Sequence, residues 1–195
     1  ETVALNPRDP VGLSASSYML HHVAAREHNA EKAKELRRKS LAAAEAAYAA
    51  DPASAHAAFA QTRAYFTLGR CPASLGLARR AEDGNPLDAD MLSRLAIIYQ
   101  MCGDGEQASR LSERALSLDQ AFPAVPLMAR ASVLLTQGRP QQALDQLAGM
   151  ANLQPVTAHY HVLQSLALAQ LGRRAEAQEH WNRLIALAGM PENAR

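Results

Sequence analysis

The chain has 195 residues, of which 48% are hydrophobic, and twenty basic side chains nearly balance nineteen acidic ones, giving a formal net charge of +1. This balance gives no electrostatic reason to expect a nucleic acid or an anionic membrane as a partner, and no run of about 20 apolar residues is present to span a bilayer. Alanine supplies about a fifth of the residues and runs of Val, Ile and Thr are few, so the composition predicts an all-α domain.

The N-terminal part of the chain is predicted to hold two helices. Residues 1–12 are interpreted as the tail of a preceding unit or as an N-terminal extension. The helix pair is placed in 13–52, with a first helix over about 13–27 and a second over about 30–50. The second helix ends before Pro52, which cannot continue a helix, and it is about two turns longer than the second helices predicted farther along the chain.

From residue 53 onward, glycine recurs at separations of 34, 35 and 34 residues. A small residue stands seven positions before and five positions after each glycine, and a Tyr or Leu stands four positions before it. The glycines are Gly69, Gly103, Gly138 and Gly172. The small residues are Thr62, Ala96, Ala131 and Ser165 before them, and Ser74, Ala108, Ala143 and Ala177 after them. The large residues are Tyr65, Tyr99, Leu134 and Leu168.

Each feature of this pattern has a physical cause. Glycine ends the first helix and permits a tight turn into a second one. Small residues on both sides of the turn let two antiparallel helices approach closely, and the Tyr or Leu fills the space between them. Pro86 and Pro155 follow the second helix in the first and third copies, where they start the next unit, while Gln120 takes this place in the second copy.

This spacing resembles the tetratricopeptide repeat (TPR), a helix–turn–helix of about 34 residues. Family-type residues are most complete in the second copy: Leu92, Leu95, Ala96, Tyr99, Gly103, Ala108, Ala115 and Leu116. Departures are Ala58 and His161 at the first large position, and Gln61, Arg130 and Gln164 at the next. The resemblance implies a right-handed α–α superhelix of about five helix pairs. These are a variant pair at 13–52 and repeats at 53–86, 87–120, 121–155 and 156–190, with a C-terminal tail at 191–195.

Members of this family bind peptides or protein segments in a concave groove lined by the first helices, so the resemblance implies the same surface here. Alignment of the copies places thirteen principal residues in the groove: His56, Phe59, Arg63, Phe66, Asp90, Ile97, Met101, Val125, Met128, Ser132, His159, Val162 and Leu166. It also places there Thr67, Ser93, Gln100, Leu135 and Ala169.

Two interpretations of the apolar members of this set stay open. They form a groove for an apolar or amphipathic partner segment, in which methionine adds adaptability, or they pack between neighbouring repeats or under residues 1–12. The resemblance disfavours one mode of binding, because family members that grip a C-terminal carboxylate use Lys, Arg and Asn where this chain has Phe59, Ile97 and Met128. Arg63 and Arg94 are within reach of an acidic group, but the full set is missing.

Several other features are interpreted as structural. The basic segment at 32–40 is expected to be a solvated helix face rather than an anion site. Cys71 and Cys102 are too far apart in sequence for a short metal motif and are expected to be reduced thiols. Trp181 is expected in the core. The polar outer positions of the last helix suit a capped end more than a continuing stack: Glu179, Asn182 and Arg183.

The sequence gives no indication of catalysis. It lacks a nucleophile elbow, a zinc-protease motif, a phosphate loop and a dinucleotide fingerprint. Neither His21 with His22 nor His159 with His161 has both rings on one side of a helix, so neither pair alone predicts a metal site. We therefore expect no enzyme activity, no cofactor and no metal in this segment.

The predicted function is a noncatalytic scaffold that binds a protein or peptide partner, with no nucleic acid contact, no membrane insertion and homodimerisation left open. One alternative is a ligand-sensing or dimerising regulatory domain of a larger bacterial protein, which a DNA-binding or cyclase domain in the flanking sequence would indicate. Others are an envelope polysaccharide-export scaffold and a purely structural spacer. The cytoplasm is slightly favoured over the periplasm, and the partner and oligomeric state are not predicted.

Overall fold

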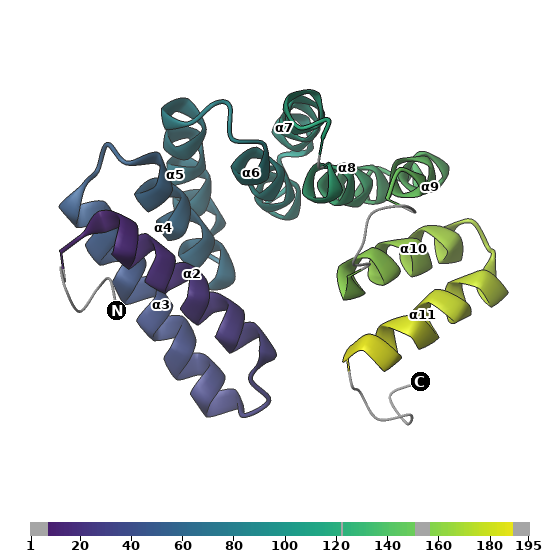
Figure 1. The fold of residues 1–195 in the computed structure, drawn as a ribbon, viewed down its shortest axis with the longest axis horizontal. Coiled ribbons are helices and arrows are strands. Elements are labelled where there is room, and N and C mark those ends of the chain that lie inside the picture. The colour runs from purple at the N-terminus through teal and green to yellow at the C-terminus, as the bar shows by residue number, and fades with distance from the viewer. Residues whose placement is uncertain (1–7, 122, 151–156, 189–195) are drawn as a thin grey trace. The chain divides into compact units, whose positions relative to one another are not determined.

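The computed structural model describes residues 8–121, 123–150 and 157–188, and in these ranges it consists of ten helices and no strands (Figure 1). The predicted all-α class is confirmed. The chain divides into two compact units, Glu1–Pro86 and Leu87–Arg195, here named unit 1 and unit 2.

Unit 1 holds two antiparallel helix pairs. They are α2 (Pro10–Arg26) with α3 (Ala30–Ala50), and α4 (Ala55–Thr67) with α5 (Cys71–Gly84). Its core is built largely of alanine, including Ala44, Ala47, Ala57, Ala78 and Ala81, none of them more than slightly accessible. Since a methyl group takes little room, the helices pack closely. The two helices of the first pair are also tied together in the interior, where the Ser40 hydroxyl donates to the Ser17 carbonyl at 2.9 Å.

Unit 2 holds three helix pairs with a core of larger side chains. The pairs are α6 (Ala89–Met101) with α7 (Gly105–Leu118), α8 (Ala124–Thr136) with α9 (Pro140–Ala148), and α10 (Ala158–Gln170) with α11 (Arg174–Ala188). Leu92, Leu95, Tyr99 and Leu111 fill the first pair and are almost fully buried. A second cluster, which includes Leu134, Leu147 and Leu163, joins α8, α9 and α10. The first helix of each pair contacts the first helix of the next, so α6, α8 and α10 lie in one row.

The boundaries of the first pair follow from capping residues. Asp9 accepts hydrogen bonds from the N–H groups of Val11 and Gly12, and Pro10 occupies the first turn, so α2 begins three residues earlier than predicted. The second helix spans Ala30–Ala50, as the sequence predicted. It is the longest helix described, and the carbonyl of the Asn29 side chain caps its start. Residues 1–7 of the predicted extension, and Pro155, lie outside the described residues.

All four glycines lie at the tight turns that the pattern predicted, and all four have a left-handed backbone conformation. Their φ angles are +71° at Gly69, +90° at Gly103, +70° at Gly138 and +75° at Gly172. In each turn the N–H of the next residue donates to the carbonyl of the predicted large residue at 2.9 Å. The acceptors are Tyr65, Tyr99, Leu134 and Leu168. The Tyr or Leu therefore closes the turn through its backbone as well as filling the space between the helices.

The small residues on either side of each turn mark the place where the two helices meet. Thr62 and Ser74 are both fully buried, and the Ser74 hydroxyl donates to the Thr62 carbonyl at 2.9 Å. In the last pair the Ser165 hydroxyl donates to the Ala177 carbonyl at 3.0 Å. A side chain that bonds to the backbone of the opposite helix requires the close approach that the small residues allow.

Polar residues that replace the large apolar ones of the repeat have polar partners in the interior. Gln61 donates to the hydroxyl of Tyr65 at 3.2 Å, and Gln164 donates to that of Tyr160 at 2.9 Å. Arg130 forms an ion pair with Glu113 at 2.7 Å. Hydrogen bonds within a hairpin or to the preceding one thus replace part of the apolar packing.

Two expectations about single residues are wrong. Cys71 and Cys102 are disulfide-bonded rather than reduced. Trp181 is 37% exposed rather than buried, because α10 is the principal helix that α11 packs against and it covers only one side of α11.

Replacement of Gly69 by alanine tests the turn. No other heavy atom would lie within 4 Å of an added Cβ, so the cost comes from the φ of +71° alone. We expect Gly69→Ala to lower the free energy of unfolding by about 1–2 kcal/mol, measured by urea denaturation.

The matched control is Gly76→Ala in the same unit. Gly76 lies within α5, has no positive φ and has equally open space around its Cβ position. Because alanine is the better helix former, this variant should be more stable than the wild type by about 0.5–1 kcal/mol. Equal effects of the two substitutions would contradict the assigned role of the turn glycine.

Candidate partner-binding surface

Equivalent positions on successive first helices are fixed by their distance from the turn glycine. In unit 2, the packing of α6, α8 and α10 in a row joins these positions into a single surface, here named the unit 2 first-helix face. Its members lie two, six, ten or thirteen residues before the turn glycine of their own hairpin, which is Gly103, Gly138 or Gly172. They are Asp90, Ile97, Met101, Val125, Met128, Ser132, His159, Val162 and Leu166. All nine are at least partly exposed.

The unit 2 first-helix face is largely apolar. Met101 is 66% exposed and Leu166 is 50% exposed, although both are large hydrophobic side chains. Ile97, Val125 and Val162 are partly exposed beside them. Apolar side chains gathered on one face in this way are characteristic of interaction surfaces rather than of ordinary solvent-facing helices.

Other sequence-predicted groove residues face the interior. Ser93 is fully buried and donates to the Ala89 carbonyl at 2.7 Å, and Leu135 is 5% exposed, so the placement of these two in the groove is wrong. Met128 has a mixed role, since it packs on the cluster of α8, α9 and α10 and its sulfur accepts a hydrogen bond from Thr157 at 3.7 Å. Gln100 is partly exposed, and Ala169 is exposed.

The charged groups on this face neutralise one another. Asp90 accepts two hydrogen bonds from Arg94, at 2.7 and 3.0 Å, in a bidentate ion pair one turn along α6. The guanidinium group of Arg94 is thus engaged within its own helix rather than presented to an acidic ligand.

In unit 1 the corresponding face is formed by α2 and α4 and is aromatic and basic. The Arg63 guanidinium group lies over the ring of Tyr18 at 4.4 Å and near that of Phe59 at 5.7 Å. Phe66 is partly exposed on the same helix, and His56 is exposed. Stacking on two rings holds Arg63 in place by cation–π attraction.

A histidine pair continues this face along α2. The ring of His22 lies 4.4 Å from that of Tyr18 and 5.6 Å from that of His21. His21 Nδ1 is 3.3 Å from the hydroxyl of Thr67, which donates to the Arg63 carbonyl at 2.8 Å. Burial, and then the positive charges of Arg63, His22 and Arg37, lower the pKa of His21 to about 4.

Sequence reasoning missed Tyr18, His21 and His22 as parts of a surface. The repeat phase is lost before residue 53, so no alignment assigned positions on α2. The available signal was helical spacing, because His21 and His22 follow Tyr18 by three and four residues, so each of the two rings can lie next to that of Tyr18 on the helix surface.

No group of three or more His, Cys, Asp or Glu side chains could hold a metal ion in the part of the chain that the structure describes. His161 pairs with a histidine of α11, because its Nδ1 atom lies 3.0 Å from the Nδ1 atom of His180. Burial lowers the pKa of both rings. No described helix is both long and apolar enough to cross a membrane.

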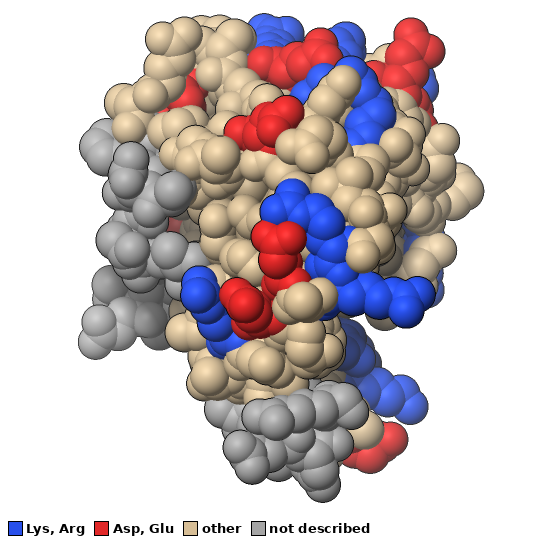
Figure 2. All heavy atoms as spheres, turned by 90° about the vertical axis from the view of Figure 1, so that its right-hand side faces the viewer, with Lys and Arg blue, Asp and Glu red and all other residues tan. Residues whose placement is uncertain are grey.

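Charge is also distributed without a dominant sign on the face of the molecule seen in Figure 2. Basic and acidic side chains are interspersed there with uncharged surface. A patch suited to nucleic acid would be continuous and basic.

Known structures share this fold at low sequence identity. The chain is similar to YrrB, described as a TPR protein with an unusual peptide-binding site (TM-score 0.56, 17% identity, 95% of this chain and 90% of that one). It is similar to PilF of Pseudomonas aeruginosa (TM-score 0.65, 16% identity, 93% and 80%) and to TPR-like repeats of a Podospora anserina kinesin light chain protein (0.63, 16%, 91% and 95%). No family model matches the sequence, and no curated protein matches it.

The environment of His21 predicts a pH dependence of stability. Its pKa is about 4 in the folded chain and about 6.5 in the unfolded chain, so the unfolded chain takes up a proton first as the pH falls from 6.5 to 4. His21 therefore lowers the free energy of unfolding over this interval, by about 1 kcal/mol at pH 5 once the partial exposure of the ring is allowed for.

Urea denaturation at pH 7 and pH 5 measures this effect. His21→Gln should lose less stability than the wild type between the two pH values, whereas the exposed His28→Gln serves as the control and should behave like the wild type. The assignment fails if His21→Gln shows the full wild-type loss.

Proposed function

Because the chain has the tetratricopeptide-repeat fold, we propose that it is a noncatalytic scaffold that binds a protein partner, and that a segment of this partner lies on the unit 2 first-helix face. The observation that carries the proposal is the exposure of Ile97, Met101, Val125, Val162 and Leu166 on three helices packed in a row.

The chemistry of this face favours an apolar or amphipathic segment. Full burial of one large aliphatic side chain contributes roughly 1.5–3 kcal/mol, so covering several that are already half-buried supplies enough free energy for moderate affinity. Methionine suits such a surface, because its unbranched side chain adapts to partners of different shape. Met101 and Met128 provide two such side chains on this face.

Polar groups at the edge of the face would fix the position of the bound segment. Ser132 and His159 each present a hydrogen-bonding side chain beside the apolar residues, and the Asp90–Arg94 pair borders them on α6. Such groups add little affinity, but a partner that leaves them unpaired is disfavoured. That YrrB, a protein of the same fold, is described with a peptide-binding site supports a peptide segment as the ligand.

The test uses peptides selected from a phage-displayed library against the intact chain. The variant carries Met101→Ser and Leu166→Ser, which remove the two most exposed apolar side chains of the face. We expect the selected peptides to be rich in apolar residues and to bind this variant at least about tenfold more weakly, because each lost contact is worth about 1 kcal/mol. Affinity is measured by fluorescence anisotropy.

The control variant carries Leu118→Ser and Leu187→Ser. These leucines are 39% and 56% exposed, but they lie on the second helices α7 and α11. The control should bind within about twofold of the wild type. Equal losses in the two double variants, or selection of peptides without apolar residues, would count against the proposed face.

A further inference from the structure

A hollow of about 960 Å³ lies beside the first half of α3 in unit 1, on a part of the surface that the proposed function does not use. Half of the residues that line it are basic and come from α3 and from the α4–α5 turn: Lys32, Lys34, Arg37, Arg38 and Arg70. We propose that this hollow, here named the basic hollow, binds an acidic segment of a partner protein. It is formed by α3, by the α4–α5 turn and by Thr67 at the end of α4, and it shares no residue with the unit 2 first-helix face.

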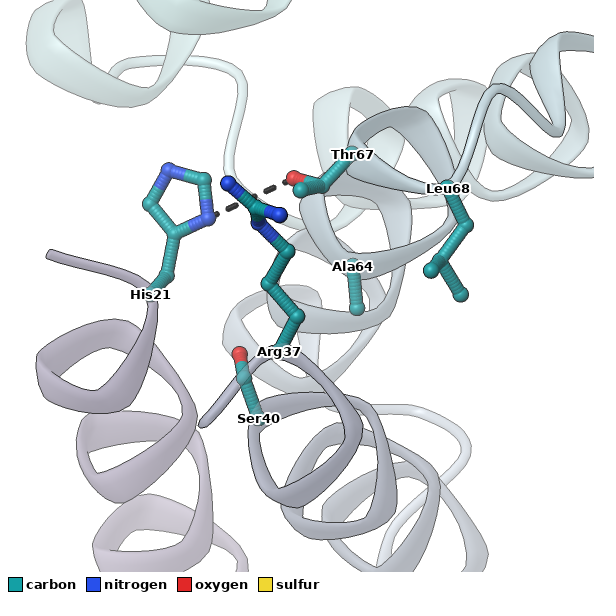
Figure 3. A pocket seen from close by; sticks show the side chains of 6 residues that line it. All are labelled: His21, Arg37, Ser40, Ala64, Thr67 and Leu68. Atoms are coloured by element: carbon teal, nitrogen blue, oxygen red, sulfur yellow. Dashed lines mark hydrogen bonds between the residues drawn. The ribbon is translucent and has the colours of Figure 1, made fainter. Parts of the chain in front are cut away.

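The extra length of α3 creates the basic hollow. Arg37 and Ser40 lie level with Thr67, the last residue of α4, around one small pocket (Figure 3). The seven residues of α3 that precede Arg37 therefore run beyond the end of α4, over a length of about 10 Å. Because α4 ends there, the side of this extension that faces the α4–α5 turn is left open.

The hollow has an excess of positive charge that the ion pairs of the structure leave in place. Its lining contains five basic and two acidic residues. Lys32 pairs with Glu27 at 2.8 Å, and Glu35 pairs with Lys39 at 2.6 Å, so each of these is neutralised by a residue outside the lining. Glu31 is then the acidic group that remains against four cations.

The four remaining cations are accessible. Lys34, Arg37, Arg38 and Arg70 are all exposed, and none of them takes part in an ion pair with another described residue. Arg70 is oriented by the ring of Tyr65, which its guanidinium group approaches to 5.8 Å. In Figure 3 the Arg37 side chain extends along the pocket toward His21 and Thr67. Arginine is the side chain best suited to bidentate contacts with carboxylates.

The rest of the lining favours a polypeptide over other anions. Leu41 and Leu68, the latter 41% exposed, give the hollow an apolar part that a side chain of a peptide could cover. The lining contains no aromatic residue on which a nucleic acid base could stack, and four cations in a recess cannot follow a run of phosphates or lie flat on a membrane. An acidic segment with interspersed apolar residues complements both parts of the hollow.

The test measures the binding of a fluorescein-labelled peptide of about twelve residues that alternates Glu and Leu. The variant carries Lys34→Gln, Arg37→Gln and Arg38→Gln, which removes three cations of the hollow. The control variant carries Arg79→Gln, Arg139→Gln and Arg174→Gln, which removes the same charge from exposed sites elsewhere. We expect the first variant to bind at least about tenfold more weakly and the control to stay within about twofold of the wild type.

Salt and competitors complete the experiment. Affinity of the wild type should fall as NaCl is raised from about 50 mM to about 500 mM, since exposed charges are screened. Circular dichroism checks that both variants remain folded, and the salt series on the wild type does not depend on that outcome.

The proposal is overturned if the acidic peptide does not bind, if both triple variants lose affinity equally, or if inorganic phosphate, a single-stranded oligonucleotide or vesicles with anionic lipid bind more tightly than the peptide. Apolar peptides that bind the unit 2 first-helix face should bind the variant with Lys34→Gln, Arg37→Gln and Arg38→Gln as tightly as they bind the wild type. If no peptide binds the unit 2 first-helix face, the experiment on the basic hollow still gives its own answer.

Discussion

The close approach of the two helices in each hairpin is the constraint on which the rest of the structure depends. It is visible where the Ser74 hydroxyl reaches the Thr62 backbone and where Ser165 reaches that of Ala177. Only small residues permit such contact, and only a glycine with positive φ reverses the chain tightly enough to bring the second helix there. Once this geometry is fixed, each hairpin presents the same two faces, one to its neighbours and one to solvent, and stacking follows from burying the first of them.

Within this constraint the interior tolerates variation. Leu95 fills its position with apolar volume, whereas Gln61, Arg130 and Gln164 occupy equivalent positions and hydrogen-bond to Tyr65, Ser112 and Tyr160. A repeat whose helices are held close by backbone geometry accepts either solution, even though the Gln61 Oε1 atom stays buried without a hydrogen-bond partner. The same tolerance explains how the chain keeps the fold of YrrB at 17% identity while its sequence departs from the pattern of the family.

The features that could be predicted are those set by local sequence. Glycine and the residues around it determine the turns, so the four turns and the extra length of α3 could be predicted, whereas α9 ends at Ala148, earlier than the proline spacing indicated. Tyr18 and His21 could not be placed, because their surroundings come from α4 and no repeat phase links the two helices. The inward orientation of Ser93 and Leu135 depends on a rotation of a few tens of degrees about a helix axis, which spacing does not specify.

The two proposed surfaces arise from different parts of the same hairpin. First helices contact one another along the row, and their remaining side carries the apolar residues that packing leaves uncovered, such as Met101 and Leu166. A second helix contributes a surface of its own only when it extends past the end of the next first helix. The helix α3 does so, because it extends past Thr67, the last residue of α4. The part of α3 beyond Thr67 packs on α2 and buries Ala33, but α4 does not cover its other side, where charged side chains stay solvated: all three lysines of the chain lie between residues 32 and 39. Extension of one helix is therefore sufficient to add a site of different chemistry without disturbing the repeat.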